Sequence, residues 1–234
     1  MRVEIYSDVV CPWCYIGERR FARALAAYAG ADRVDVVFRP YQLDPNAPAK
    51  AVPVKEYLRR RFGGRVDEML ARVSENARGE GIVMDWDRAL SVNTFTAHRL
   101  LRLAEREYGA PVQRALAEKL FASHFSEGGD VSDHELLASL AESVGLDPDR
   151  VRTYLATGEG EAETRAEIEE ARRLGITAVP TFVFEGKWAV QGAQPASVFL
   201  GALEEVAAEI GEERASGGDG GDAPAACTDG SCEL

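Results

Sequence analysis

The chain has 234 residues, of which 46% are hydrophobic and 28% are charged. This is the composition of a globular protein with a substantial core, so its stability does not depend on disulfide bonds. The 27 lysines and arginines against 39 aspartates and glutamates give a formal net charge of −12, which disfavours nucleic acid and anionic membrane surfaces as partners.

The N-terminal segment lacks the features of a secretory signal. It has no basic stretch, no long apolar core and no small-residue cleavage site. No apolar run approaches the roughly 18 residues that a membrane span requires. We therefore expect a cytoplasmic protein, in a compartment that keeps thiols reduced, although a chain whose signal had been removed would start in the same way.

The first fifty residues predict a strand, a helix and a second strand. Residues 2–6 alternate between polar and apolar side chains, as a short strand does. From Pro12 onward, apolar residues recur at helical intervals until Gly30 ends the run. The segment RVDVVFRPYQL that follows is rich in β-branched and aromatic residues, which predicts a strand ending near Pro45.

The next part of the chain has helical periodicity and almost no strand signal. Four helical segments can be recognised, at residues 54–62, 98–109, 111–125 and 133–146. Ser132 and Glu135 have the spacing of a capping box for the last of these. Asp147 and Pro148 suit the N-cap and first position of a further helix. A long helix then ends at Gly175.

The C-terminal part returns to a mixed pattern. The segments TFVF and WAV flank the turn EGK and predict a β-hairpin. A helix from about Pro195 to Ile210 follows. We expect residues 211–234, which are rich in Gly, Ala and Asp, to form a mobile acidic tail. The whole pattern predicts an α/β fold, in which residues 1–50 and 159–210 form one domain around a mixed sheet and residues 51–158 form an inserted helical domain.

Cys11 and Cys14, in the segment CPWC, allow three interpretations. A zinc site needs about four ligands, but the other cysteines, Cys227 and Cys232, lie near the far end of the chain and the histidines have no ligand spacing. We therefore expect no metal. A structural disulfide between Cys11 and Cys14 would close a very small loop and constrain little of the unfolded chain. The third interpretation is a redox-active dithiol.

The local pattern favours the redox interpretation. The predicted strand delivers Cys11 to the start of a predicted helix, with Pro12 at the first helical position. Free backbone N–H groups and the positive end of the helix dipole then favour a thiolate at Cys11. Cys14 lies one turn further in, and we expect it to be the more buried thiol. Cys11 would exchange with the substrate, and Cys14 would resolve the mixed disulfide.

The segments SDVVCPWCYIG and GITAVPTFVFEGKWAVQGAQP together resemble the DsbA-like branch of the thioredoxin superfamily. The closest similarity within it is to the FrnE-like group of dithiol-disulfide oxidoreductases and isomerases. The resemblance covers about residues 2–210 and implies a thioredoxin-like mixed sheet with an inserted helical domain. It also implies a cis bond between Val179 and Pro180, beside the CPWC segment, with the Val179 backbone free to pair with an extended substrate peptide. Pro12 and Trp13 would contact the substrate as well.

One position departs from the family pattern. Thioredoxin-like enzymes often carry a buried acid six residues before the first cysteine, and here that residue is Ile5. Glu4 and Asp8 lie nearby, but strand alternation predicts both on the opposite face from Ile5. Deprotonation of Cys14 would then use water or another group. Trp13, between the cysteines, is expected to be exposed and to meet an incoming substrate.

His98 and Asn93, in the helical insertion, are weaker candidates. In relatives of this fold that isomerise aromatic substrates, the helical domain covers the active site, so either side chain could line a substrate pocket. A histidine in such a place is more often a hydrogen-bonded packing group. His124 and His134 have no partner that the sequence identifies.

Cys227 and Cys232 form a second pair in the acidic tail. The segment TDGS between them favours a turn and permits a small disulfide ring. The pair is either inert or a tethered internal shuttle that exchanges disulfides with Cys11 and Cys14 at high effective concentration.

The sequence thus predicts a thiol–disulfide oxidoreductase or isomerase of protein dithiols, with no bound cofactor and with glutathione or thioredoxin as an external reductant. One alternative is a glutathione-dependent isomerase or transferase of small aromatic compounds, resembling the 2-hydroxychromene-2-carboxylate isomerases. Those enzymes typically place a single Ser or Cys where this chain has two cysteines. The other alternative is a redox sensor that does not turn over. The direction of electron flow depends on the reduction potential of the cysteine pair. The sequence determines neither this direction nor the oligomeric state.

Overall fold

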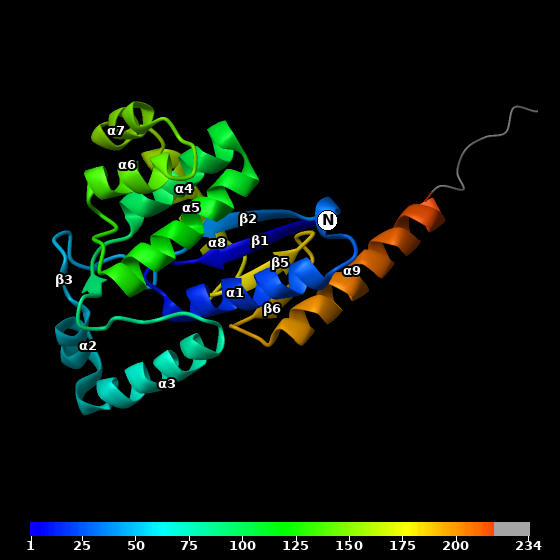
Figure 1. The fold of residues 1–234 in the computed structure, drawn as a ribbon. Coiled ribbons are helices and arrows are strands. Elements are labelled where there is room, and N and C mark those ends of the chain that lie inside the picture. Colours follow the sequence, from blue (N-terminus) through cyan, green and yellow to red (C-terminus); the bar gives the residue numbers. More distant parts are fainter. Residues whose placement is uncertain (218–234) are drawn as a thin grey trace, which may run out of the picture.

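The computed structural model describes residues 1–217. Its central sheet has four strands in the order β2-β1-β5-β6, namely β1 (Arg2–Ser7), β2 (Asp35–Pro40), β5 (Thr181–Phe184) and β6 (Trp188–Gln191). Strand β1 runs parallel to β2 and antiparallel to β5, and β5 and β6 form the predicted hairpin. The expectation of an α/β fold with a mixed sheet is therefore confirmed, and the sheet joins the two ends of the chain (Figure 1).

Two helices, α1 (Pro12–Ala27) and α9 (Ala196–Gly217), pack together against one face of this sheet (Figure 1). The aromatic ring of Phe182 on β5 lies between Phe21 of α1 and Phe199 of α9, with ring centroids 5.2 and 4.4 Å away. Ile5 of β1 pairs with Phe182 and is fully buried, so it belongs to this same face. The apolar side chains that alternate along β1 and β5 pack against α1, and this packing holds the start of α1 in place on the sheet.

Between β2 and β5 the chain is mainly helical. The helices there are α2 (Val54–Phe62), α3 (Val66–Gly79), α4 (Phe95–Tyr108), α5 (Ala110–Ala122), α6 (His134–Glu142), α7 (Pro148–Ala156) and α8 (Glu161–Arg173). A π-helical turn follows α5 at Ser123–Glu127, and short 3-10 helices lie at Ala31–Arg33 and Gly63–Arg65. A two-stranded ribbon of β3 (Val52–Pro53) and β4 (Leu90–Ser91) also lies in this segment, where the sequence predicted no strand.

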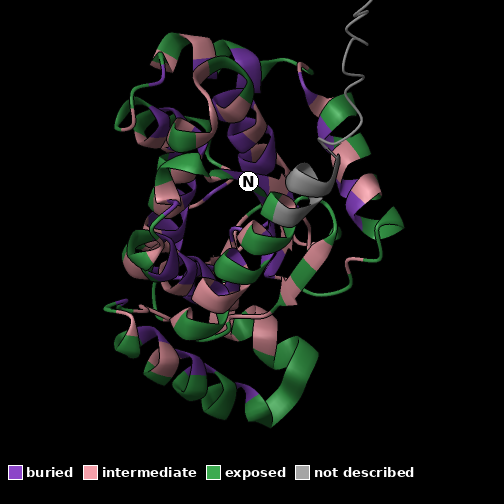
Figure 2. Ribbon diagram, turned by 90° about the vertical axis from the view of Figure 1, so that its right-hand side faces the viewer, coloured by how far each residue is buried: buried purple, intermediate pink, exposed green. Residues whose placement is uncertain are grey.

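One continuous cluster of buried apolar side chains extends from the sheet into the helical segment. Figure 2 shows these buried residues on the inner sides of the helices. Helix α2 differs, because none of its residues is buried. It lies near α3 at one edge of the molecule (Figure 1). Within residues 1–217, no helix combines the length and the apolar character that crossing a membrane would require.

Several element boundaries differ from the sequence-based expectation, and three of them have a clear physical reason or consequence. Strand β2 ends at Pro40 rather than near Pro45, because proline has no N–H to continue the ladder. The N-cap of α6 is Asp133 rather than Ser132, since the Asp133 carboxylate accepts the hydrogen bond from the Leu136 N–H at 2.7 Å. Helix α9 continues to Gly217, past the expected start of a mobile tail at residue 211.

The predicted start of α7 is confirmed. Asp147 is its N-cap, with a side chain that accepts hydrogen bonds from the N–H groups of Asp149 and Arg150. Pro148 occupies the first turn, where a missing N–H leaves no hydrogen bond unmade.

Candidate active site

The CPWC segment lies where β1 ends and α1 begins. Cys11 is the N-cap residue of α1, with extended backbone angles of φ −92° and ψ 111°, and Pro12 occupies the first turn. The Cys11 N–H donates to the carbonyl oxygen of Asp8 at 2.9 Å, and the Cys11 carbonyl accepts from the N–H of Cys14 at 3.0 Å. This compact turn directs both cysteine side chains toward the interior.

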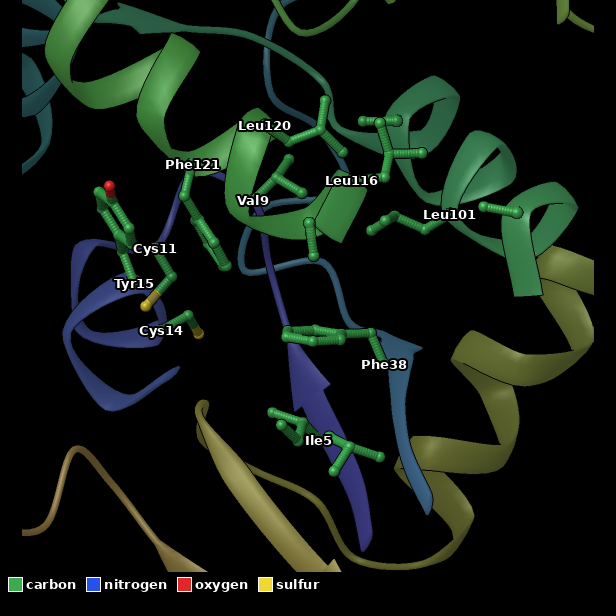
Figure 3. Packing of buried hydrophobic residues seen from close by; sticks show 14 of the residues in the cluster. Ile5, Val9, Cys11, Cys14, Tyr15, Phe38, Leu101, Leu116, Leu120 and Phe121 are labelled. Carbon is green, nitrogen blue, oxygen red and sulfur yellow. The ribbon is translucent and has the colours of Figure 1, made fainter. Parts of the chain in front are cut away.

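The two thiols are free and buried, with exposed fractions of 4% for Cys11 and 2% for Cys14. Figure 3 shows their sulfur atoms near one another at the start of α1, beside Tyr15 and Phe121. The pKa of Cys14 is raised well above its ordinary value, first by burial and then by its hydrogen bond to Cys11. Hydrogen bonds from the backbone of Asp8 and the side chain of Ser7 act on the Cys14 pKa in the opposite direction. Cys14 is therefore held as a thiol in the reduced pair.

The loop before β5 lies directly against Cys11. The Val179–Pro180 peptide bond is cis, and the Cys11 Sγ lies 3.8 Å from the Val179 carbonyl oxygen. Val179 is half-buried and Pro180 is buried. The Thr181 hydroxyl donates to the Ala178 carbonyl at 2.8 Å, which fixes the loop on both sides of the proline. The structure thus brings together Cys11, Cys14, Val179 and Pro180, four of the residues that the sequence singled out.

Gly17 is part of this arrangement and was missed by sequence reasoning. A Cβ atom at Gly17 would lie 2.9 Å from Cγ of Pro180 and 3.4 Å from Cα of Ala193. Carbon atoms that pack well are about 3.5–4.0 Å apart, so only glycine lets α1 approach the proline loop this closely. The sequence signal was a glycine inside a helical pattern, three residues after Cys14.

A cavity of about 390 Å³ opens beside Cys11, between the start of α1 and the helices α2 and α3. Its lining is mainly apolar and aromatic, with Trp13, Val54, Leu70, Trp86 and Phe125 among its walls. Trp13 is half-buried rather than exposed, because its ring packs against the apolar cluster and forms one wall of this cavity. Pro12 and Val179 also line it. An apolar group of a substrate attached to Cys11 would fit here.

Asp8 lies beside this site, one residue beyond the end of β1. Strand β1 ends at Ser7, so strand alternation does not extend to Asp8, and the side chain turns inward with 1% exposure. Glu4 does lie on the other face, where it accepts a hydrogen bond from Arg39 at 2.7 Å. The Asp8 carboxylate accepts from the Leu43 N–H at 2.8 Å and lies 3.3 Å from Nε2 of His98.

The other candidates from the sequence have different places. His98 is buried and lies 3.3 Å from Asp8 rather than lining the large cavity. Asn93 links two loop segments, donating to the Pro45 carbonyl at 3.0 Å. His124 is buried, and burial lowers its pKa to about 4, so its ring is neutral at neutral pH. His134 is exposed at the start of α6.

Cys227 and Cys232 lie outside the residues that the structure describes. Within the described part of the chain, no three or more His, Cys, Asp or Glu side chains are grouped closely enough to hold a metal ion.

Comparison with known protein families identifies the family of this chain. The family model of the DSBA-like thioredoxin domain matches residues 2–204. The chain belongs to this family. It therefore has the thioredoxin-like DsbA fold, and the expected resemblance to the DsbA-like branch is confirmed.

Individual relatives agree with this assignment. A probable DsbA oxidoreductase from Streptomyces coelicolor is 38% identical, with a TM-score of 0.81 over 89% of this chain and 91% of that one. The protein YwbO of Bacillus subtilis is 27% identical over 88% of this chain and 96% of its own. A 2-hydroxychromene-2-carboxylate isomerase shares the fold, with a TM-score of 0.63 over 92% of this chain and 98% of that one, at 18% identity.

Proposed function

We propose that this member of the DSBA-like family is a thiol–disulfide oxidoreductase or isomerase that acts on protein dithiols through Cys11 and Cys14. The observation that carries the proposal is the approach of the Cys11 Sγ to the Val179 carbonyl, 3.8 Å away, in front of a buried second thiol. A disulfide-bonded substrate peptide lying along the Val179 backbone would have its sulfur in line with Cys11.

In the reducing direction, Cys11 attacks the substrate disulfide and forms a mixed disulfide, and one substrate thiolate leaves. Cys14 then attacks the Cys11 sulfur, which releases the second substrate thiol and leaves the enzyme disulfide. In the oxidising direction the same bonds form and break in reverse. The resolving role suits Cys14, because Cys11 lines the large cavity and Cys14 does not.

An insulin-reduction assay with glutathione or thioredoxin as reductant, together with refolding of a scrambled disulfide protein, tests the proposal. Wild-type protein should turn over in at least one of these assays. The Cys11→Ser variant should be inactive, and Cys14→Ser should accumulate a mixed disulfide with the substrate. No turnover by the wild type, or full activity of Cys11→Ser, contradicts the proposal.

A second candidate function is isomerisation or glutathione transfer on a small aromatic compound, and the apolar cavity of about 390 Å³ beside Cys11 favours it. This reaction would use one thiol or bound glutathione and would not need Cys14. The Cys14→Ser variant separates the two functions, because it abolishes disulfide turnover and leaves isomerisation intact. A non-catalytic redox sensor would form the Cys11–Cys14 disulfide without turnover in either assay.

We also propose that the protein is cytoplasmic and belongs to the FrnE-like group. The cytosolic disulfide reductase DsbM of Pseudomonas aeruginosa, which shares the fold at 19% identity, gives a precedent for such an enzyme in that compartment. Measuring the reduction potential of Cys11–Cys14 tests the assignment, since a cytosolic reductase needs a potential near that of the glutathione pool.

A further inference from the structure

The resolving step of the proposed reaction requires the buried Cys14 thiol to lose its proton. Cys14 is 2% exposed, and burial raises its pKa well above the ordinary value. Only the thiolate attacks a disulfide, so Cys14 must lose its proton in a place with little access to water. The position that often carries a buried acid in thioredoxin-like enzymes is Ile5 in this chain, and its side chain is apolar and buried.

Asp8 is the acidic residue closest to Cys11 along the chain, and its backbone contacts both cysteines. Its carbonyl accepts the N–H of Cys11, and its backbone also makes a hydrogen bond to the Cys14 thiol. Asp8 is also among the residues that line the cavity beside Cys11. The residue is thus fixed to the reactive turn through its main chain.

The Asp8 carboxylate contacts polar groups from two other segments. Oδ2 accepts the Leu43 N–H at 2.8 Å, and Oδ1 lies 3.3 Å from Nε2 of His98 on α4. Asp8 is 1% exposed and His98 is 3% exposed. A buried carboxylate needs such partners to stay ionised. The imidazole of His98 beside it has two ring nitrogens, so the two side chains can share a proton.

The other buried titratable groups near the site fit this role less well. His124 has no hydrogen-bond partner for its Nδ1, and burial lowers its pKa to about 4, so it is a weak base. Glu18, one helical turn beyond Cys14, forms an ion pair with Arg114 at 3.2 Å and does not line the cavity.

We propose that the buried Asp8–His98 pair is the proton acceptor for Cys14 in the resolving step, an inference that rests on the proposed thiol–disulfide exchange. The Cys14 S–H proton passes to the pair, and the Cys14 sulfur attacks Cys11. The Cys11–Cys14 bond forms as the bond between Cys11 and the substrate sulfur breaks. The substrate leaves as a thiolate with both electrons of that bond and takes the proton back from the pair. The substrate disulfide is reduced to two thiols, and the enzyme dithiol is oxidised to a disulfide.

Several charged and titratable groups surround the pair and enter its pH dependence. Cys11 shares the cavity with Asp8, and the Cys14 thiol makes a hydrogen bond to the Asp8 backbone. The charge of Asp8 also acts on His124 in the π-helical turn. On the other side of His98, a void of about 10 Å³ is bordered by Arg39, Arg102 and Glu167. Across the large cavity the groups are Asp44, Tyr57 and Arg61.

The test follows the reaction of the reduced full-length protein with excess dithiobis(nitrobenzoate) by stopped flow. The protein carries Cys227→Ser and Cys232→Ser, so that only the CPWC thiols react. The first thionitrobenzoate released reports attack by Cys11, and the second reports resolution by Cys14. Asp8→Asn should slow the second phase about 10²-fold at neutral pH, the usual size of a general-base contribution. The first phase should change by less than about threefold, because Cys11 does not use the pair.

The pH profile distinguishes this role from a structural one. In Asp8→Asn the second phase should depend on hydroxide and rise steadily with pH, whereas the wild-type rate should level off once the pair is deprotonated. His98→Gln, which keeps an N–H donor for Asp8, should show a smaller loss and a shifted profile. His134→Gln, an exposed histidine on α6, is the matched control and should leave both phases unchanged.

Two results would overturn the inference alone: a normal second phase in Asp8→Asn across the pH range, or an equal slowing of both phases. If Asp8→Asn does not fold, an unchanged profile in His98→Gln overturns it. A wild-type protein that releases no second thionitrobenzoate overturns the proposed function and, with it, this inference.

Discussion

Substituting alanine for Gly17 tests how closely α1 and the proline loop must pack. The added Cβ would lie 2.9 Å from Cγ of Pro180, about 0.6 Å closer than the lower limit of ordinary carbon contact. A proline ring cannot rotate away, and the next neighbour is the backbone Cα of Ala193 at 3.4 Å. The loop that carries Val179 must therefore shift relative to Cys11.

The expected stability change is the sum of two opposing effects. Alanine in place of glycine inside a helix stabilises by about 1 kcal/mol, and overpacking of a filled interior costs about 1–3 kcal/mol. Gly17→Ala should thus change the free energy of unfolding by between about zero and 2 kcal/mol in the destabilising direction. Gly201, inside α9, has no atom within 4 Å of its added Cβ. Gly201→Ala should therefore stabilise by about 1 kcal/mol.

Urea unfolding of both variants, with the disulfide-reduction assay, checks the prediction. Gly17→Ala should also lose activity, because its loop carries the Val179 carbonyl that lies 3.8 Å from the Cys11 Sγ. Gly201→Ala should keep the wild-type activity. If Gly17→Ala proved as stabilising as Gly201→Ala and fully active, the close packing of α1 against the loop would not be what requires glycine at position 17.

Three further predictions concern other parts of the molecule. The pKa of His124 falls from 6.5 in the unfolded chain to about 4 in the folded protein. The folded state therefore loses about 3 kcal/mol of stability as the pH falls from 6.5 to 4. Urea unfolding of His124→Gln should show a shallower pH dependence in this range. Arg114→Met leaves the buried Glu18 carboxylate without its ion pair and should cost about 3–5 kcal/mol, most of which a second substitution, Glu18→Leu, should restore. The shuttle hypothesis predicts that Cys227→Ser with Cys232→Ser slows re-reduction of CPWC, and equal recycling with every reductant would contradict it.

The periodic parts of the fold could be read from the sequence. Alternation in β1, the helical spacing after Pro12 and the turn between β5 and β6 are local patterns, and they correctly predicted the sheet. The ribbon of β3 and β4 could not be predicted, because each strand has two residues and one contains Pro53. Such pairing depends on the tertiary contacts of the helices beside it. The cavity was missed for the same reason, since its walls come from segments far apart in the chain.

The contacts of Asp8 could not be predicted from strand alternation. Alternation holds only while the chain is extended, and β1 ends at Ser7, one residue before Asp8. The turn that makes Cys11 an N-cap also rotates the Asp8 side chain into the interior, where His98, from a different part of the chain, lies 3.3 Å away. No local pattern pairs these two residues. The same turn therefore fixes the positions of both the Cys11 thiol and the Asp8 carboxylate. The two cysteines and Asp8 thus form one structural unit, and Asp8 is not simply an acid that happens to be near the CPWC motif.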